Sequence, residues 1–205
     1  MPYDTLASQH SLDTTVAALQ KKGVQVYVAD TKAAALDLIK QLIPKGASVM
    51  NGSSKTLEQV GYAEYLKEGT HGWVDLHKSV TDEPDAAKRA ELRKNAITSE
   101  YYLGSVHALT EQGEYIVASN TGSQLPHIAF TSPNLILVVG TQKIVPSMAD
   151  AMKRLEEYIV PLEDKHMQEL YGTGTQLNKI LIVKNENPML KRQIYCILVK
   201  EPVGF

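Results

Sequence analysis

Regular alternation between helical and strand-like segments over the first 95 residues is the feature that most limits how this chain can fold. Short apolar stretches rich in β-branched residues are separated by stretches with helical periodicity. The predicted strands are 24–29, 47–50 and 72–77, and the predicted helices are 4–22, 30–43, 56–67 and 83–95. Because helical crossovers connect parallel strands, this order predicts a parallel sheet covered by helices on both faces.

The pattern changes after about residue 100, where extended segments predominate. A tight turn at "EQG" (111–113) separates two of them, and "LILVVG" (135–140) is typical of a buried strand. The remaining predicted elements are a helix at 147–159 and strands at 179–184 and 193–200.

The chain has 205 residues, of which 43% are hydrophobic, and this suffices for one domain with a sizeable core. We therefore predict a single α/β domain over residues 1–205. It has a Rossmann-like, mainly parallel sheet covered by helices on both faces, with a smaller antiparallel or mixed element in the C-terminal half. The helix at about 4–22 is predicted to be an appendage of this domain.

Charge and cysteine content exclude several classes of function. The 21 Lys and Arg residues nearly balance the 23 Asp and Glu residues, so no overall field selects nucleic acid or an anionic membrane. The single cysteine, Cys196, rules out an iron–sulfur cluster held by this chain alone, and its apolar neighbours predict a buried, inert thiol. The six histidines lack metal-binding spacing, so no metal site is expected. The N-terminus lacks a signal-peptide pattern and no apolar run could span a bilayer, so we expect a cytoplasmic protein.

A polar loop, "NGSSKT", follows the predicted strand at 47–50 and opens the next helix. Backbone N–H groups and the helix dipole at such a position favour an anion. The loop is not a Walker A motif, because Ser54 stands where that motif has the glycine before its lysine. The alternative is that Ser54 or Thr56 only caps the helix, and the spacing leaves both interpretations open. The candidate ligand-binding residues are Asn51, Gly52, Ser53, Ser54, Lys55 and Thr56.

Other polar residues stand near turns. A carboxylate beside a pocket can act as nucleophile or general base, which makes Glu111 a catalytic candidate, although an acidic residue at such a turn is more often an ordinary turn residue. His107 and His127 are acid–base candidates or structural histidines. A second polar loop lies between apolar segments and is suited to anion binding or to turns: Asn120, Thr121, Gly122 and Ser123.

Taken in order, these segments resemble the LUD domain, a lactate-utilisation family. "NGSSKTLEQVGYAEYL" is similar to the family's "GGS-x-TL-x-E-x-G-x-x-E-x-L" segment. "SVHALTEQGEYIVASNTGSQLPHIAFTSPNLILVVGTQKIV" is similar to its "NAITEDGTIVNIDGTGNR" and "VIVVVGINKIV" stretches. "LEEYIVPLEDKHM" and "ILVKEPVGF" also correspond, so the resemblance covers residues 10–205.

The resemblance implies the fold shared by ribose-5-phosphate isomerases, glucosamine-6-phosphate deaminases and coenzyme A transferases. In those proteins a Gly/Ser/Thr loop after an early strand binds a sugar phosphate or lines the acyl-CoA pocket. In the coenzyme A transferases a Glu in a turn similar to "TEQG" forms the acyl-enzyme bond, and Glu111 stands at the corresponding position. The resemblance therefore implies a pocket formed by loops 51–56 and 119–124, with coenzyme A or a phosphate-type group as a compatible ligand.

The chain departs from the family pattern in two places. Many LUD proteins carry a cysteine cluster before the final strands, and this chain has none there, so an iron–sulfur or redox role for it is not supported. Gln124 replaces the arginine of "GTGNR", so a positive charge for an anion must come from elsewhere. Lys143 and Lys55 are the candidates.

Two functions from different classes follow from these observations. The first is binding of an organic acid, sugar phosphate or acyl-CoA in lactate or organic-acid utilisation, with Glu111 as catalytic residue if the protein is an enzyme. The second is a non-catalytic accessory or regulatory subunit that partners iron–sulfur lactate-oxidising proteins. A homodimer is expected only because symmetric pairs are common.

Overall fold

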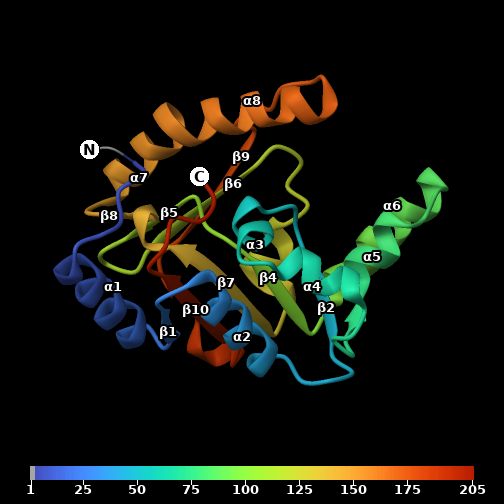
Figure 1. Cartoon of the computed structure of the whole chain (residues 1–205), viewed down its shortest axis with the longest axis horizontal. Helices are drawn as coiled ribbons and strands as arrows, with labels where there is room; N and C mark the ends of the chain where they lie inside the picture. Colours follow the sequence, from blue (N-terminus) through green and yellow to red (C-terminus); the bar gives the residue numbers. More distant parts are fainter. Residues whose placement is uncertain (1–2) are drawn as a thin grey trace.

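The computed structural model describes residues 3–205, which contain ten strands and eight α-helices (Figure 1). The strands are β1 (Gln25–Ala29), β2 (Ser48–Asn51), β3 (Val74–Asp75), β4 (Tyr101–Gly104), β5 (Ala108–Thr110), β6 (Tyr115–Ser119), β7 (Asn134–Gly140), β8 (Ile144–Val145), β9 (Lys179–Val183) and β10 (Gln193–Val199). The helices are α1 (Gln9–Lys21), α2 (Lys32–Leu42), α3 (Lys55–Gln59), α4 (Tyr62–Glu68), α5 (Leu76–Thr81), α6 (Ala86–Asn95), α7 (Met148–Arg154) and α8 (Val160–Tyr171). A π-helical turn at Leu155–Ile159 joins α7 to α8.

The strands form two sheets. The larger sheet has the order β1-β10-β7-β4-β2-β3, and all its neighbouring strands pair in parallel. The smaller sheet has the order β8-β5-β6-β9, with a parallel β5–β8 pair and antiparallel β5–β6 and β6–β9 pairs. The predicted α/β fold, a mainly parallel sheet with a smaller mixed element in the C-terminal half, is confirmed.

One face of the larger sheet is covered by α2, α3 and α4. Thr31 begins α2 by accepting a hydrogen bond from the backbone N–H of Ala34, and the four-residue spacing of Ala35 and Ile39 places both on the sheet. Leu57 of α3 and Tyr62 of α4 extend the same apolar layer. Fully buried β7 lies under this layer, which is why its sequence is apolar without alternation.

The opposite face of the larger sheet is covered by α1 and by the smaller sheet. Leu12 and Leu19 of α1 pack with Leu137 of β7 and Val117 of β6 in one hydrophobic cluster. The outer face of the smaller sheet packs in turn against α7 and the turn at Leu155–Ile159. The sequence predicted helices on both faces of the larger sheet. On this face, the smaller sheet replaces part of that predicted helical layer.

Two predicted elements were wrong in part. The helix predicted at 56–67 is two short helices, because Gly61 adopts a left-handed conformation with φ +84° between α3 and α4. The strand predicted at 72–77 is only β3, because the side chain of Asp75 accepts a hydrogen bond from the backbone N–H of Lys78 and begins α5.

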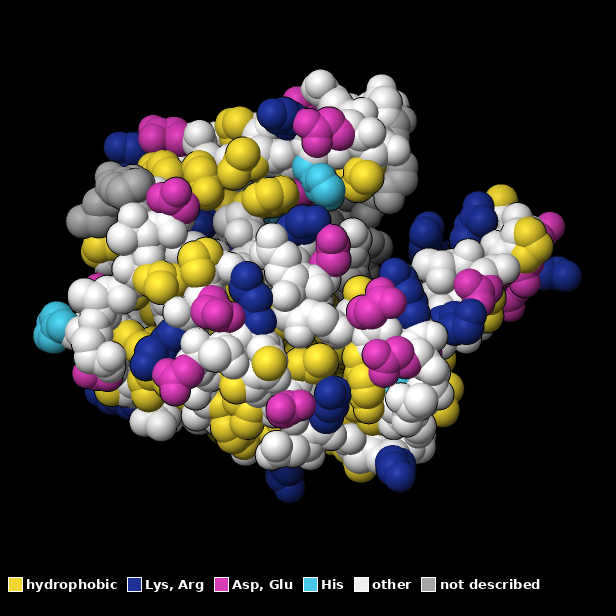
Figure 2. Space-filling view, in the orientation of Figure 1, with side chains coloured by type: hydrophobic (Ala, Val, Ile, Leu, Met, Phe, Trp, Pro, Cys, Tyr) yellow, Lys and Arg dark blue, Asp and Glu magenta, His cyan; other side chains and the backbone are white. Residues whose placement is uncertain are grey.

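Helices α5 and α6 form an arm that stands out from the body (Figure 1). Helix α6 buries none of its residues, and the arm carries Lys and Arg side chains interspersed with Asp and Glu (Figure 2). Within residues 3–205, no helix combines the length and apolar character needed to cross a bilayer.

Candidate functional site

A cavity of about 500 Å³ lies where four parallel strands of the larger sheet end. Its lining includes the segments that follow β2, β4, β7 and β10, namely residues 52–56, 105–107, Lys143 and 204–205. The carboxyl ends of parallel strands meet at one edge of a sheet, where ligands of α/β proteins commonly bind. The fold thus brings segments between Gly52 and Phe205 that are distant in sequence to one place.

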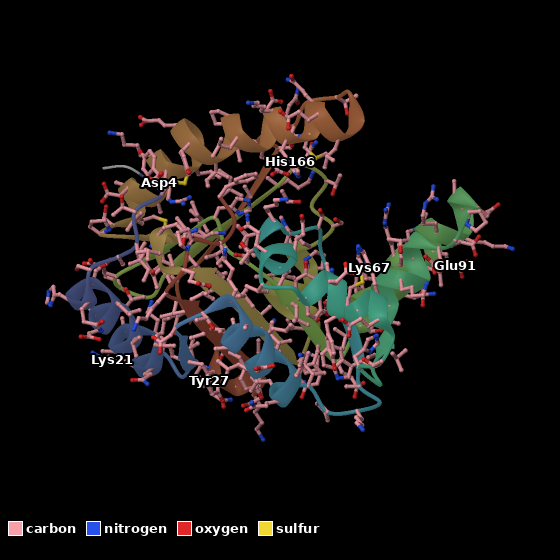
Figure 3. All side chains as sticks on the ribbon, in the orientation of Figure 1. Asp4, Lys21, Tyr27, Lys67, Glu91 and His166 are labelled. Carbon is pink, nitrogen blue, oxygen red and sulfur yellow. The ribbon has the colours of Figure 1, made fainter. Side chains whose placement is uncertain are left out.

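Opposite walls of the cavity come from the smaller sheet and from two helices. Arg93 of α6 and His166 of α8 both line it, and Figure 2 shows the surface hollowed between α8 and the arm. Figure 3 labels His166 on α8 and Glu91 on α6, on the two sides of this hollow.

Loop 52–56 is held by a helix cap and by a close contact at Gly52. The hydroxyl of Ser54 accepts a hydrogen bond from the backbone N–H of Leu57, so the capping interpretation is correct for Ser54. A side chain at Gly52 would place its Cβ only 2.8 Å from the hydroxyl oxygen of Tyr102. Glycine is therefore required here by the close approach of the loop to β4.

Lys143 is the most unusual residue of the cavity. It follows β7 in a 3₁₀ turn at Thr141–Lys143, and only 4% of its surface is exposed. Its Nζ donates hydrogen bonds to Oγ1 of Thr56 (3.0 Å), to Oγ of Ser105 (3.2 Å) and to the carbonyl oxygen of Val106 (3.2 Å). All three partners are uncharged.

No carboxylate within residues 3–205 forms an ion pair with Lys143. Burial, reinforced by the guanidinium of Arg154, lowers the pKa of Lys143 to about 7. Arg154 is itself buried and donates to the backbone carbonyls of His107 and Tyr3. This end of the cavity is therefore positively charged in a region shielded from water.

His107 also lines the cavity. Its Nδ1 accepts a hydrogen bond from the backbone N–H of Ala118 (3.1 Å), so the neutral ring carries its proton on Nε2. Burial, with the charges of Lys143 and Arg154, lowers the pKa of His107 to about 3. At neutral pH this histidine is an uncharged hydrogen-bond donor.

The second polar loop lines the cavity beside the first, and a Cβ on Gly52 would lie 3.3 Å from Oε1 of Gln124. Oγ1 of Thr121 donates to Oγ of Ser123, and the carbonyl of Asn120 accepts from Nζ of Lys179. The amide of Gln124, in the place of the family's arginine, donates to the carbonyl of Ala118. The loop offers hydroxyl and amide groups to the cavity, and Lys143 supplies the buried charge.

An apolar wall completes the cavity beneath α8. It consists of Leu155, Ile159, Val160, Met167, Leu170, Leu177 and Phe205. A ligand with a charged group at the Lys143 end and an apolar or uncharged body against this wall would match both sides.

Most of the predicted ligand-binding residues come together here, and four predicted residues do not line the cavity. One of these is the acid–base candidate His127, which is buried and stacks on the ring of Tyr102. Those that line it are Gly52, Ser53, Ser54, Lys55, Thr56, Asn120, Thr121, Ser123 and Lys143. Asn51 is buried behind the loop and Gly122 is turned toward Lys179. Glu111 lies at the β5–β6 turn, where its N–H donates to the carbonyl of Val145. Neighbouring Gly113 packs on α1, which explains why this turn faces away from the strand ends.

Sequence reasoning missed Ser105, Gly204 and the residues of α8. Ser105 directly follows the apolar strand β4, and its position at a strand end was an available signal. The local sequence gives no signal for Gly204 or for the apolar wall beneath α8. Their positions in the cavity depend on how segments distant in the sequence pack together. No group of three or more His, Cys, Asp or Glu residues placed to hold a metal ion occurs among the described residues.

The depressed pKa of Lys143 predicts a pH dependence of stability. The unfolded chain keeps this proton up to pH 10.5, the ordinary lysine pKa, whereas the folded chain releases it near pH 7, so the free energy of unfolding should rise with pH between these values. The slope is at most about 1.4 kcal/mol per pH unit. Urea unfolding of wild type and Lys143→Met between pH 7 and 9 measures it, because other titrating groups cancel in the difference. Parallel pH profiles would contradict the prediction.

Comparisons with known proteins agree with this architecture. The family model of the LUD domain matches residues 12–198 of the chain. Six chains among the solved structures match. One is a DUF162 family protein from Deinococcus radiodurans, with 12% sequence identity, a TM-score of 0.58, and coverage of 95% of this chain and 99% of that chain. At this identity the similarity supports the fold. No curated protein matches the chain.

Proposed function

The chain belongs to the LUD-domain family, and from that premise we propose that it binds a small organic anion in the cavity at the carboxyl ends of its parallel strands. One observation carries the proposal. Lys143 is a buried cation without a carboxylate partner among the described residues, and it lines the cavity. Burying an ammonium group without an opposite charge is costly, and an anionic ligand would offset that cost.

The groups around Lys143 suit an anion. The hydroxyls of Thr56 and Ser105 accept hydrogen bonds from the ammonium, so the proton of Thr56 can be donated to a ligand oxygen. The proton of Ser105 is directed at the carbonyl of Val106 over 3.4 Å and would have to turn toward a ligand. The N–H of His107 is a further neutral donor. An anion held by these groups would meet the charge of Lys143 directly or through the two hydroxyls.

Size and polarity narrow the ligand class. A volume of about 500 Å³ accommodates a small organic acid or a sugar phosphate entirely, whereas an acyl-CoA could insert only one end. The apolar wall beneath α8 favours an organic anion over inorganic phosphate. The family's link to lactate utilisation makes short carboxylic acids the first compounds to test. The proposal concerns binding, and it assigns Glu111 no contact with the ligand.

Calorimetric titration and thermal unfolding with propionate, lactate, glucose 6-phosphate and acetyl-CoA test the proposal. We expect saturable binding of at least one anion. At a ligand concentration of about 100 Kd, Tm should rise by about 5–10 °C. Propionamide, which has the shape of propionate without its charge, is the control and should bind at least about tenfold more weakly. Absence of binding by every anion, or equal binding of propionamide, would overturn the proposal.

A further inference from the structure

The surroundings of Lys143 suit a neutral amine as well as an ammonium ion. Thr56 and Ser105 each present a hydroxyl that can accept from an N–H or donate to a nitrogen lone pair, and the carbonyl of Val106 accepts in either case. A neutral amine can therefore donate two hydrogen bonds and receive one without any group being left unpaired. No carboxylate within the described residues forms an ion pair that would keep the nitrogen protonated.

Lys55, which also lines the cavity, differs in this respect. Its Nζ lies 2.8 Å from the carboxylate of Glu58, and its side chain is 30% exposed, so it is neither buried nor without a carboxylate partner. Lys67, labelled in Figure 3, is exposed and pairs with Glu64 on α4, away from the cavity lining. Among these three lysines, Lys143 is therefore the one whose position in the cavity, burial and hydrogen-bond partners all favour the neutral, nucleophilic amine.

We propose that Lys143 forms a Schiff base with the carbonyl carbon of a small anionic aldehyde or ketone bound in the cavity. This inference rests on the proposed anion site and adds a substrate class to it, namely organic anions that carry a carbonyl group. A 2-oxo acid has this chemistry. The anionic group would be held by hydroxyl and N–H donors of the cavity while the carbonyl carbon faces Nζ.

The step is balanced without a co-reactant. The lone pair of Nζ forms a bond to the carbonyl carbon, and the carbonyl oxygen takes the proton that the nitrogen loses, which gives a neutral carbinolamine. The hydroxyl group of the carbinolamine takes up one proton from the solvent and leaves as water while the nitrogen lone pair forms the C=N bond. The nitrogen keeps its remaining hydrogen, so the product is a protonated imine. Oγ1 of Thr56 and Oγ of Ser105 lie 3.0 and 3.2 Å from Nζ, where they can pass protons between nitrogen and oxygen.

The lowered basicity of Lys143 supports this chemistry. Because the pKa of Lys143 falls to about 7 on burial, a large share of the molecules carries the neutral amine near neutral pH. An ordinary lysine is neutral in only about one molecule in a thousand at pH 7.5. The nucleophilic form is therefore available at Lys143 far more often than at exposed lysines.

Borohydride trapping tests the inference. Wild-type protein is incubated with pyruvate at pH 7.5, reduced with borohydride and digested, and the modified lysine is located by mass spectrometry. We expect saturable modification of Lys143, at least about tenfold above any exposed lysine, because the share of neutral amine differs so strongly. Propionate, which lacks the carbonyl, should compete. Lys67→Met should leave the modification unchanged, and Lys143→Arg should remove it.

The outcomes separate this inference from the anion site on which it rests. Saturable binding of propionate and pyruvate without an adduct on Lys143 would overturn the Schiff base and leave the anion site standing. No binding of either compound, with no adduct, would overturn both. Modification spread evenly over exposed lysines would also overturn the inference. Mapping on the wild-type chain decides the matter even if Lys143→Arg fails to fold.

Discussion

Lys143→Met is expected to weaken the binding of organic anions by about 10- to 100-fold while the chain remains folded. Methionine is unbranched and of similar length, so it can follow the same path between β7 and α3. The substitution removes a buried charge that has no carboxylate partner among the described residues, which relieves a desolvation cost. It leaves the hydroxyls of Thr56 and Ser105 without this donor, whereas the carbonyl of Val106 keeps its hydrogen bond from Ser105. These effects oppose each other, and the free energy of unfolding should change by no more than about 2 kcal/mol.

The effect on binding should be much larger than the effect on stability. A charge-assisted hydrogen bond contributes about 1.5–3 kcal/mol, so its loss should weaken binding by about 10- to 100-fold. Calorimetry with the tightest anion found for the wild type, at pH 6.5 where Lys143 is mainly protonated, measures this directly. Lys67→Met is the matched control, because it removes an exposed lysine of the same size. Equal affinity of wild type and Lys143→Met would show that the buried lysine is not the anchor.

Gly204→Ala should cause the largest loss of stability among the changes considered and should also disturb the lysine site. Gly204 has φ +70°, and a Cβ at this position would clash with Oγ1 of Thr56 and lie 2.7 Å from Nζ of Lys143. Backbone strain of about 1–2 kcal/mol and overpacking of about 1–3 kcal/mol should together lower the free energy of unfolding by about 2–5 kcal/mol. Because the new methyl group separates Thr56 from Lys143, anion binding should fall as well.

The control substitution Gly46→Ala separates the contribution of backbone strain from that of overpacking. Gly46 has φ +84°, and a Cβ there would meet nothing within 4 Å, so this substitution carries backbone strain without the clash. Urea unfolding of wild type and both variants gives the two free-energy losses. We expect the loss in Gly204→Ala to exceed that in Gly46→Ala by at least about 1 kcal/mol. Similar losses in the two variants would mean that the C-terminal segment moves away from Lys143 at little cost.

The sequence predicted long apolar strands better than very short ones. Continuous apolar, β-branched runs identify β7 and β10, because strands inside the sheet that are buried on both faces need such residues. The run at β1 was also recognised, although β1 is an edge strand and partly exposed. The two-residue strand β3 has too little apolar sequence to stand out, and the helical pattern across Gly61 conceals a break that depends on one left-handed glycine. Local sequence patterns therefore predict an element correctly where burial alone determines which residues the element needs.

The candidate site was only partly visible in the sequence for a related reason. Polar loops at strand ends can be recognised locally, and the structure brings loops 52–56 and 119–124 to one cavity. Within residues 3–205, Lys143 forms no ion pair, and its hydrogen-bond partners are set by packing between distant segments: Thr56 and Lys143 are 87 positions apart. No spacing rule in the sequence shows such an arrangement. Glu111 stood out by resemblance of its turn, but the contact of that turn with α1 could not be read from the same motif.

The place of β10 in the larger sheet has a consequence for how the chain reaches its native state. Among the described strands, β10 comes last in the sequence, yet it lies between β1 and β7. Within the described sheet, β1 pairs with β10 alone. During synthesis, β1 must wait until residues 193–199 have left the ribosome, although it emerges well before them. Contacts between segments so distant in sequence slow folding, and the exposed edges of β1 and β7 are open to wrong pairing in the interval. The cavity is completed no earlier than this sheet, since Gly204, which follows β10, is part of its lining.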